Sequence, residues 1–483
     1  MHNPSLAFSL RTLSLLALLV SYVTYSTLWA QDSLTEAPLD TAMQARMDEA
    51  DSLRRLYQSD LALEIYEPLL KDAQEAEQWK IVRSCHFGLG SIYADQGQNE
   101  WALQAHVKPG LEVNDKYLQS NAQFALLFKQ LKTQIFYNAG LISQGISTLT
   151  ESEKILPEAK EVAIQNKQFS AFQFQKWALF NLGMVLNIRS QQFDKVKSYG
   201  QKLLQVVDEI EFGPGMESAF QTVWATYYTN LGEMYVAMEQ LDSALLMNEK
   251  ALNFIGSRQD FIASSILFNL ANILAETGHP EAAMAKADSA ILVMGSVLGE
   301  NSPELTKVFI LKARLFMQAS QPDSARAYLE RVLKLRSKDP DKLLLSEGIP
   351  PHSSFELEEF TLTALKMLSA LELQEADLSA PSSPTSLQKV LEYSEVVKSF
   401  VDTLRFSGRL GSKPGYITAL DTFATQMDIG IEASFRLAQI ETEREKAYFE
   451  KSLQFSEANK YNQHLFGILQ GQLDQIDGIP PDS

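Results

Sequence analysis

The chain has 483 residues, 45% of them hydrophobic and 10% aromatic, and its formal net charge is −18. This length exceeds what one compact core organises, and the apolar content excludes a disordered chain. So acidic a surface repels phosphate backbones, which disfavours nucleic-acid binding. The densest basic run, Arg326 to Lys338, has helical spacing and indicates the solvated face of one helix rather than a nucleic-acid patch.

The first thirty residues form a segment of their own. Arg11 is their only charged side chain, and an apolar run from Leu13 to Val23 follows it. A positive head, a short apolar core and a small residue before a polar start are typical of a secretory signal. We therefore expect residues 1–30 to be a signal peptide cleaved after Ala30, and the protein to be exported to the periplasm or beyond the cell. The competing hypothesis is an uncleaved anchor, because the uncharged span of residues 12–30 is just long enough to cross a bilayer.

Helical spacing of apolar residues begins at Thr41 and recurs along most of the chain, without the alternation that marks strands. Ala50 and Ala62 stand twelve positions apart in a first, degenerate pair of helices. A second pair contains Gly90, and we expect its second helix to be cut short at Lys108-Pro109-Gly110. Further pairs are predicted at Tyr117–Asn138 with Gln144–Ala163, and from Phe172 to Ile210.

The same helical hairpin is repeated three times between Ala225 and Leu335. In each copy a small residue of the first helix precedes a small residue of the second by twelve positions: Gly232 and Ala244, Ala271 and Ala283, Ala313 and Ala325. A small residue lets two helix backbones approach closely. The breaks between helices carry Asp242 and Asp323, which we predict as N-caps. Pro280 and Pro322 suit the first turn of a helix.

This pattern resembles the tetratricopeptide repeat, whose unit is roughly 34 residues. The copies here are wider, since Gly232 to Ala271 is 39 positions and Ala271 to Ala313 is 42. The resemblance implies an all-α fold, a right-handed superhelical solenoid of helix-turn-helix pairs. The predicted array covers residues 31–338, with its clearest units at 225–256, 264–295 and 306–336.

After Lys338 the repeat rhythm falters. Residues 339–386 are expected to form an irregular segment with one helix, Phe355–Asp377. Residues 387–483 then continue the solenoid with long helices, predicted at Leu387–Phe406, Tyr416–Glu441 and Glu445–Gln470.

The C-terminal end carries a second resemblance. Residues from Tyr448 to Lys460, and from Leu473 to Pro480, are similar to the segment that joins repeats to protease in CHAT proteins. Those are large bacterial chains with tetratricopeptide repeats followed by a caspase-like CHAT domain. The resemblance implies a chain that stops before the catalytic domain, so that no position here inherits a catalytic role.

Candidate chemistry is sparse. Cys85 is the only cysteine, and His86 beside it makes the only thiol–imidazole neighbour. Adjacent residues on a helix point about 100° apart, so we expect packing rather than a catalytic dyad. The other histidines lack metal-ligand spacing, and the glycines form no phosphate-binding loop. We therefore predict no catalytic residue, no metal and no cofactor, and a chain that is not an enzyme.

What remains is binding. In the family that the repeats resemble, the first helices of successive pairs line a concave groove. By that register, the predicted partner-binding residues are Trp177, Phe180, Asn181, Met184, Thr226, Thr229, Asn230, Glu233, Phe268, Asn269, Asn272, Lys307, Ile310 and Arg314, with Glu276 on the same face. Asn181, Asn230 and Asn269 share one repeat position, where an asparagine of related repeats can bond the backbone of an extended peptide. The equal alternative is that it satisfies a neighbouring helix.

Together these observations predict a non-catalytic exported scaffold whose partner is a protein or peptide. Nucleic acid is not expected as a partner, and a membrane is expected only if residues 12–30 stay attached. One alternative is the substrate-recruiting or regulatory N-terminal portion of a CHAT-type cysteine protease. Another is the sensor portion of a membrane signalling protein.

Overall fold

The computed structural model describes residues 40–476 apart from 57, 214, 341–342, 344–347, 356–358, 379–383 and 407–414. The predicted signal segment, residues 1–30, lies outside the described residues. Secondary structure within the described part is helical, apart from a single β-bridge that joins Ser337 to Phe355. The all-α fold of paired helices is thereby confirmed. The chain divides into two compact units, one up to Arg258 and the other from Gln259, a division inside the predicted array.

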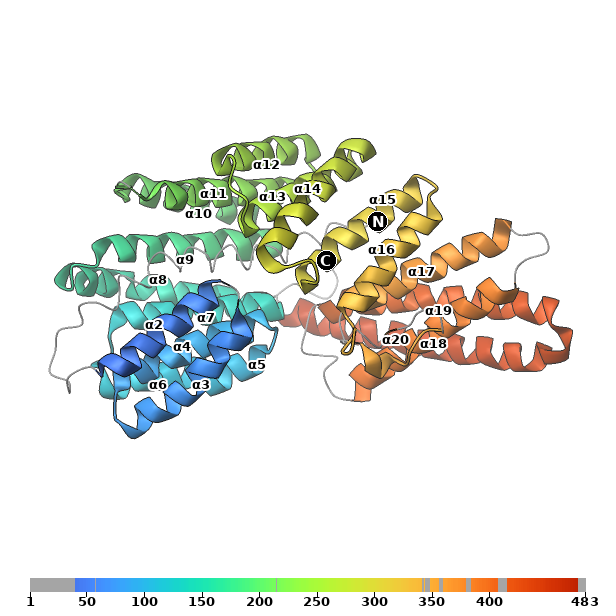
Figure 1. Cartoon of the computed structure of the whole chain (residues 1–483), viewed down its shortest axis with the longest axis horizontal. Helices are drawn as coiled ribbons and strands as arrows, with labels where there is room; N and C mark the ends of the chain where they lie inside the picture. The colour runs from blue at the N-terminus through green and yellow to red at the C-terminus, as the bar shows by residue number, and fades with distance from the viewer. Residues whose placement is uncertain are drawn as a thin grey trace. The chain divides into compact units, whose positions relative to one another are not determined.

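Unit 1 is a stack of helical hairpins in chain order (Figure 1). Its elements are α2 (Thr41–Arg55), α3 (Ser59–Glu75), α4 (Trp79–Asp95), α5 (Asn99–Trp101), the π-helical turn η2 (Ala102–Val107), α6 (Lys108–Tyr117), α7 (Ala122–Ala139), α8 (Ile142–Gln165), α9 (Phe169–Arg189), α10 (Phe193–Glu209), α11 (Glu217–Ala237) and α12 (Leu241–Ile255). The first helix of a pair packs on its own second helix and on the next first helix, as α9 does on α10 and α11.

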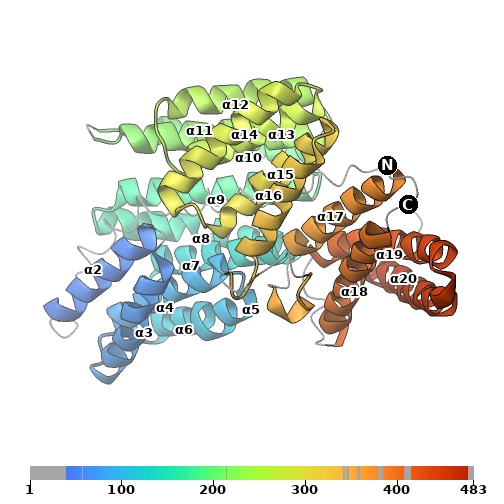
Figure 2. The same cartoon turned by 45° about the vertical axis from the view of Figure 1, so that its right-hand side comes forward.

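Unit 2 continues with hairpins, and Figure 2 shows its α17 to α20 grouped in orange and red. Its elements are α13 (Phe261–Glu276), α14 (Pro280–Leu298), η3 (Pro303–Leu305), α15 (Thr306–Gln318), α16 (Pro322–Leu335), η5 (His352–Ser354), α17 (Glu359–Leu378), α18 (Pro384–Phe406), α19 (Gly415–Ile440), η7 (Thr442–Arg444) and α20 (Glu445–Ile476). Gln426 of α19 ties three helices together, because its Nε2 donates to Ser369 Oγ of α17 at 2.8 Å and Ser394 Oγ of α18 at 2.9 Å.

The predicted helix stop at Lys108-Pro109-Gly110 is wrong. Helical structure continues from Asn99 through to Tyr117, as α5, η2 and α6 follow one another without a break. Pro109 has no backbone N–H, and the turn before it is π-helical instead of ending the helix. Gly110 makes room for the Phe128 ring, since a β-carbon there would come within 2.3 Å of it. Tyr117 therefore ends this helix rather than opening the next one.

The small-residue pattern of the three clear hairpins is confirmed by close packing. A β-carbon at Gly232 would lie 2.2 Å from the side chain of Asn248 on α12. The alanines of the pattern are fully buried: Ala244, Ala271, Ala283, Ala313 and Ala325. Small side chains thus set the closeness of the helices, as the twelve-residue spacing predicts.

The predicted N-caps are displaced by two positions. Gln240 and Gln321 occupy the cap positions of α12 and α16, and neither side chain makes a capping hydrogen bond. Asp242 and Asp323 lie in the first turns instead, where their carboxylates favour the positive end of the helix dipole. Both prolines predicted for a first turn open their helices, α14 and α16.

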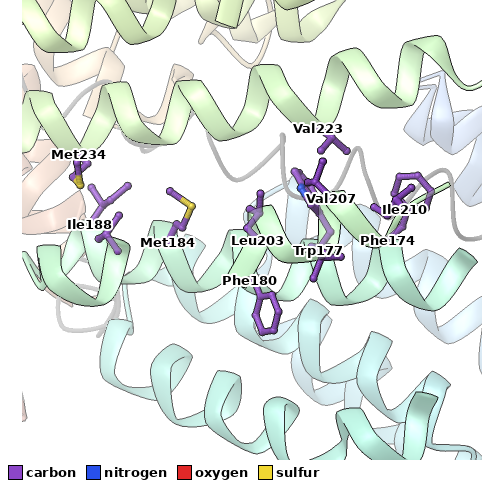
Figure 3. Packing of buried hydrophobic residues seen from close by; sticks show 13 residues of the cluster. Phe174, Trp177, Phe180, Met184, Ile188, Leu203, Val207, Ile210, Val223 and Met234 are labelled. Atoms are coloured by element: carbon purple, nitrogen blue, oxygen red, sulfur yellow. The ribbon is translucent and has the colours of Figure 1, made fainter. Parts of the chain in front are cut away.

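A hydrophobic core fills the space between α9, α10 and α11 in unit 1 (Figure 3). Trp177 of α9 and Leu203 of α10 are fully buried in it, and Val223 contributes from α11. Figure 3 shows the Trp177 side chain beside Val207 and below Val223. Burial of an aromatic side chain of this size contributes several kcal/mol to stability.

Across the residues with a described position, no helix combines the length and apolarity needed to span a bilayer.

Candidate functional site

The predicted partner-binding residues fall on the first helices of four successive pairs, and the structure divides them between the two units. Those of unit 1 lie on α9 and α11: Trp177, Phe180, Asn181, Met184, Thr226, Thr229, Asn230 and Glu233. All of them are buried, and none exposes more than 6% of its surface. The expectation that they face an open groove is not met in unit 1, because the unit's own side chains fill the space.

The asparagines of α9 and α11 bond to each other. Nδ2 of Asn230 donates to Oδ1 of Asn181. This contact agrees with the second alternative for the repeated asparagine, in which its side chain hydrogen-bonds a neighbouring helix rather than a bound peptide. The remaining amide atoms, Asn181 Nδ2 and Asn230 Oδ1, are buried without a hydrogen-bond partner among the described residues, as is the hydroxyl of Thr226. Such atoms are costly to leave unsatisfied, about 1–3 kcal/mol each.

The enclosure of α9 has a clear cause in its composition. Every residue from Ala171 to Ile188 except Lys176 is buried. Helices that are apolar on all sides are enclosed by neighbours, whereas surface helices have a polar stripe. This segment shows no polar stripe, and that signal could have predicted that its groove-register positions are inaccessible.

The predicted residues of unit 2 lie on α13 and α15. Phe268, Asn269 and Ile310 are buried, with 1%, 4% and 8% of their surfaces exposed. Asn272, Lys307 and Arg314 are half-buried, and so is Glu276. These four polar side chains make up what we name the α13/α15 row. It is the part of the predicted binding face that keeps a polar surface accessible.

Arg314 holds this row together. Its Nη1 donates to Glu276 Oε1 at 3.1 Å, and its Nη2 donates to Asn272 Oδ1 at 3.3 Å. Burial lowers the pKa of the Arg314 guanidinium below its ordinary value, and the adjacent carboxylate opposes that shift. The group stays charged at neutral pH, because arginine is not deprotonated in proteins. A charged group of α15 is therefore held against α13.

Lys307 lies two turns before Arg314 on α15 and covers aromatic rings of α13. Its Nζ is 5.3 Å from the ring centroid of Phe268 and 5.7 Å from that of Phe261. Cation–π contacts of this kind are worth about 0.5–1 kcal/mol at exposed sites. The α13/α15 row thus presents charged and amide groups positioned by buried rings, which suits recognition of a polar peptide surface.

Cys85 packs in the core of unit 1, as predicted. Its Sγ lies 3.8 Å from Sδ of Met47, and burial raises the pKa of its thiol. His86 bonds to His106 instead of the sulfur, with 3.3 Å between the two Nδ1 atoms. Sequence reasoning missed this pair because the two histidines are 20 positions apart, on different helices.

The two histidines form a neutral pair. Burial lowers the pKa of His86 to about 4, and burial likewise lowers that of His106 to about 4. Tyr93 stacks on His106, with ring centroids 5.3 Å apart, and its hydroxyl donates to Glu67 Oε1 at 2.7 Å. Within the part of the chain that is described, no three His, Cys, Asp or Glu side chains gather as a metal site.

The comparisons with known proteins agree with the repeat resemblance in one hairpin. Residues 224–255 match the tetratricopeptide repeat family model. This range covers most of α11 and all of α12, the first of the three clear hairpins. No curated protein matches the chain. The resemblance of the C-terminal end to CHAT proteins finds no support in these comparisons.

Several solved structures are similar to this chain at low sequence identity. BtubC (BKLC) from P. vanneervenii is 17% identical with a TM-score of 0.39, over 54% of this chain and 90% of its own. The apo form of RapI is 12% identical with a TM-score of 0.43, over 82% and 99%. A Rap protein complexed with competence and sporulation factor is 11% identical with a TM-score of 0.40, over 89% and 99%.

Proposed function

We propose that this chain is a non-catalytic scaffold that binds a protein or peptide partner along the α13/α15 row of unit 2. The observation that carries the proposal is the half-buried Arg314 of α15, which bonds both Glu276 and Asn272 of α13. Polar groups pre-positioned in this way lose little entropy when a partner binds. The matched tetratricopeptide hairpin supports a scaffold role, because stacked repeats present extended surfaces to other chains.

The charges of the row indicate the chemistry of the partner. The row contains two cations, Lys307 and Arg314, and one carboxylate, in a chain of net charge −18. A segment with a carboxylate and free backbone carbonyls would accept hydrogen bonds from both cations. We therefore expect an extended segment of mixed polarity that carries at least one acidic group.

Site-specific cross-linking tests this proposal. A photoreactive side chain at Asn272 or Lys307 should cross-link the partner, and the same side chain at Ser289, which is exposed on α14, is the matched control. The substitution Arg314→Gln should remove the adducts formed from Asn272. Equal adducts from all three positions, or adducts that persist in the Arg314→Gln variant, would contradict binding at the row.

We also propose that the protein is exported. The support is the N-terminal pattern alone, with Arg11 ahead of the apolar run Leu13–Val23. Reading the N-terminus of the mature protein after cell fractionation tests this, and we expect a chain that starts at Gln31 outside the cytoplasm. A membrane-bound chain with residues 12–30 intact would favour the anchor hypothesis. A cytoplasmic chain that starts at Met1 would contradict the proposal that the protein is exported.

A further inference from the structure

An apolar patch lies on the surface of the hairpin formed by α19 and α20 in unit 2. Phe435, Phe449 and Leu453 are 48%, 41% and 60% exposed, and we name these three residues the α20 patch. The two phenylalanine rings meet edge to face, with their centroids 5.3 Å apart. Large apolar side chains that gather on a surface mark an interaction site more often than single ones do.

The opposite side of this hairpin is packed within unit 2. A β-carbon at Gly430 would lie 2.9 Å from Ser394 of α18 and 3.1 Å from the ring of Phe455 on α20. Phe455 is fully buried, whereas Leu453 two positions earlier is the most exposed residue of the patch. The hairpin therefore has one filled face and one apolar face that reaches solvent, the arrangement on which repeat stacks accept another helix.

Charged residues share the helix face of the patch. Lys446, Phe449, Leu453, Glu457 and Lys460 follow one another at intervals of three, four, four and three residues, and all are exposed. This is the spacing of a helix seam that packs against a second helix. The patch thus belongs to a continuous seam with apolar residues near its middle and charges towards its ends.

The charges of α20 cancel where its side chains are described. Between Glu445 and Lys460 three acidic residues balance three basic ones: Glu445, Glu450 and Glu457 against Lys446, Lys451 and Lys460. The whole chain, in contrast, carries −18. Two copies of so acidic a protein repel each other over most of their surfaces, and a locally neutral face is where they can approach without that cost.

When a second copy of α20 lies antiparallel to the first, opposite charges of the two copies face each other. About a point midway between Lys451 and Ser452, Lys446 and Glu457 are equidistant. Two antiparallel α20 helices that cross at this point would place Lys446 of each copy beside Glu457 of the other copy. Leu453 would then meet the aliphatic stem of Glu450, close to the two-fold axis.

From the apolar seam and its reversed charge order we infer that α20 binds α20 of a second copy of this chain, antiparallel about a two-fold axis. Side chains of roughly 200 Å² each, about half exposed, give about 300 Å² of apolar contact per copy. A standard interface buries about 800 Å² on each partner, so the charged flanks must contribute. The dimer is consequently weak, with a dissociation constant in the micromolar range.

Sedimentation velocity of the full chain over a concentration series tests the inference. The unaltered chain should shift from monomer to dimer as concentration rises, and Leu453→Glu should stay monomeric throughout. Lys446→Glu should weaken the dimer about tenfold, because the new carboxylate then faces Glu457 of the other copy at two symmetric places in the dimer. Adding Glu457→Lys to that variant should restore the dimer. Lys334→Glu, the same charge change on the exposed face of α16, is the matched control and should leave it unchanged.

Three outcomes would overturn the inference. A chain that remains monomeric at every concentration has no such interface. A dimer that survives Leu453→Glu uses another surface. A charge swap that fails to restore the dimer excludes the antiparallel pairing. Circular dichroism of each variant checks that it folds, and cross-linking of a partner from Asn272 is independent of all three results.

Discussion

The inner helices of the two units share a repeat register but differ in what they leave accessible. On α9 and α11 the asparagines bond each other, and the surrounding aromatic and aliphatic side chains close over them. On α13 and α15, Asn272 bonds Arg314 instead, and the pair stays half-buried. Enclosing a guanidinium completely is costly, whereas two neutral amides can be sealed between helices. Charge alone does not keep a face accessible, because Glu233 at the equivalent position of α11 is only 2% exposed.

The tryptophans allow this comparison to be followed in solution. The four tryptophans of the described residues, Trp79, Trp101, Trp177 and Trp224, all lie within unit 1. Tryptophan fluorescence therefore reports unfolding of unit 1 alone, while far-ultraviolet circular dichroism reports helices of both units.

The largest effect is expected at the sealed face. Trp177→Ala removes a fully buried side chain from the core of unit 1 and should lower its free energy of unfolding by about 3–5 kcal/mol. Urea unfolding followed by the remaining tryptophans measures this loss. Asn272→Ala in unit 2 is the control; its unfolding is followed by far-ultraviolet circular dichroism, and a change of about 0.5 kcal/mol or less is expected. Similar losses of unfolding free energy from the two variants would contradict the distinction between the buried face of α9 and α11 and the accessible face of α13 and α15.

Acid should weaken unit 1 by a smaller amount. The pKa of His86 and that of His106 are about 4 when folded, against 6.5 for a free imidazole. Unfolding therefore takes up protons between these values, so the stabilising contribution is complete above pH 6.5 and is lost as pH falls towards 4. The lowered pKa of a single histidine corresponds to about 3 kcal/mol over this window, and we expect a loss of this order, read from urea midpoints of tryptophan fluorescence.

The double substitution His86→Leu with His106→Leu tests whether these two histidines cause the loss of stability in acid. Without the imidazoles, the stability of unit 1 should vary much less between pH 6.5 and 4. An unchanged pH slope would show that groups other than the two imidazoles dominate the pH dependence.

A moderate effect is expected from the asparagine pair. Asn181→Ala leaves the amide of Asn230 buried without its partner and should cost about 1–3 kcal/mol. Asn253→Ala, on the exposed side of α12, is the matched control and should be nearly neutral. A double-mutant cycle with Asn230→Ala measures the coupling, which should be about 1 kcal/mol; additive losses would mean that the contact contributes nothing.

The smallest effect on stability should come from the accessible face. Arg314→Gln breaks the contact with Glu276, a half-buried pair worth about 1 kcal/mol or less once solvent screening is included. Thermal unfolding by circular dichroism should shift little, while cross-linking of a partner from Asn272 is lost. A large drop in melting temperature would instead assign Arg314 a structural role.

Much of the fold could be predicted because its determinants are local. The twelve-residue spacing of Gly232 and Ala244, and of its two later copies, predicted hairpins that the structure confirms. The displaced caps at Asp242 and Asp323 were a local error of two residues. The uninterrupted run through Pro109 could not be predicted from the proline alone, because the π-helical turn before it and the packing of Phe128 on Gly110 leave no signal at the proline itself.

The candidate site was less predictable, because accessibility is not a property of a repeat position. Sequence reasoning placed Trp177 and Lys307 on one equivalent face, yet the first is fully buried and the second is half-buried. Likewise, nothing in the spacing of His86 and His106 indicated that they would meet.

The sequence by itself determined the helices, their pairing into hairpins and the small residues at which they touch, since these depend on side chains within a few turns of one another. Which of the register positions are sealed, which histidines pair and which apolar residues reach solvent was decided only in the tertiary structure. Burial and hydrogen bonding there depend on side chains brought together from helices distant in the chain, and those contacts leave no periodic signal in the sequence.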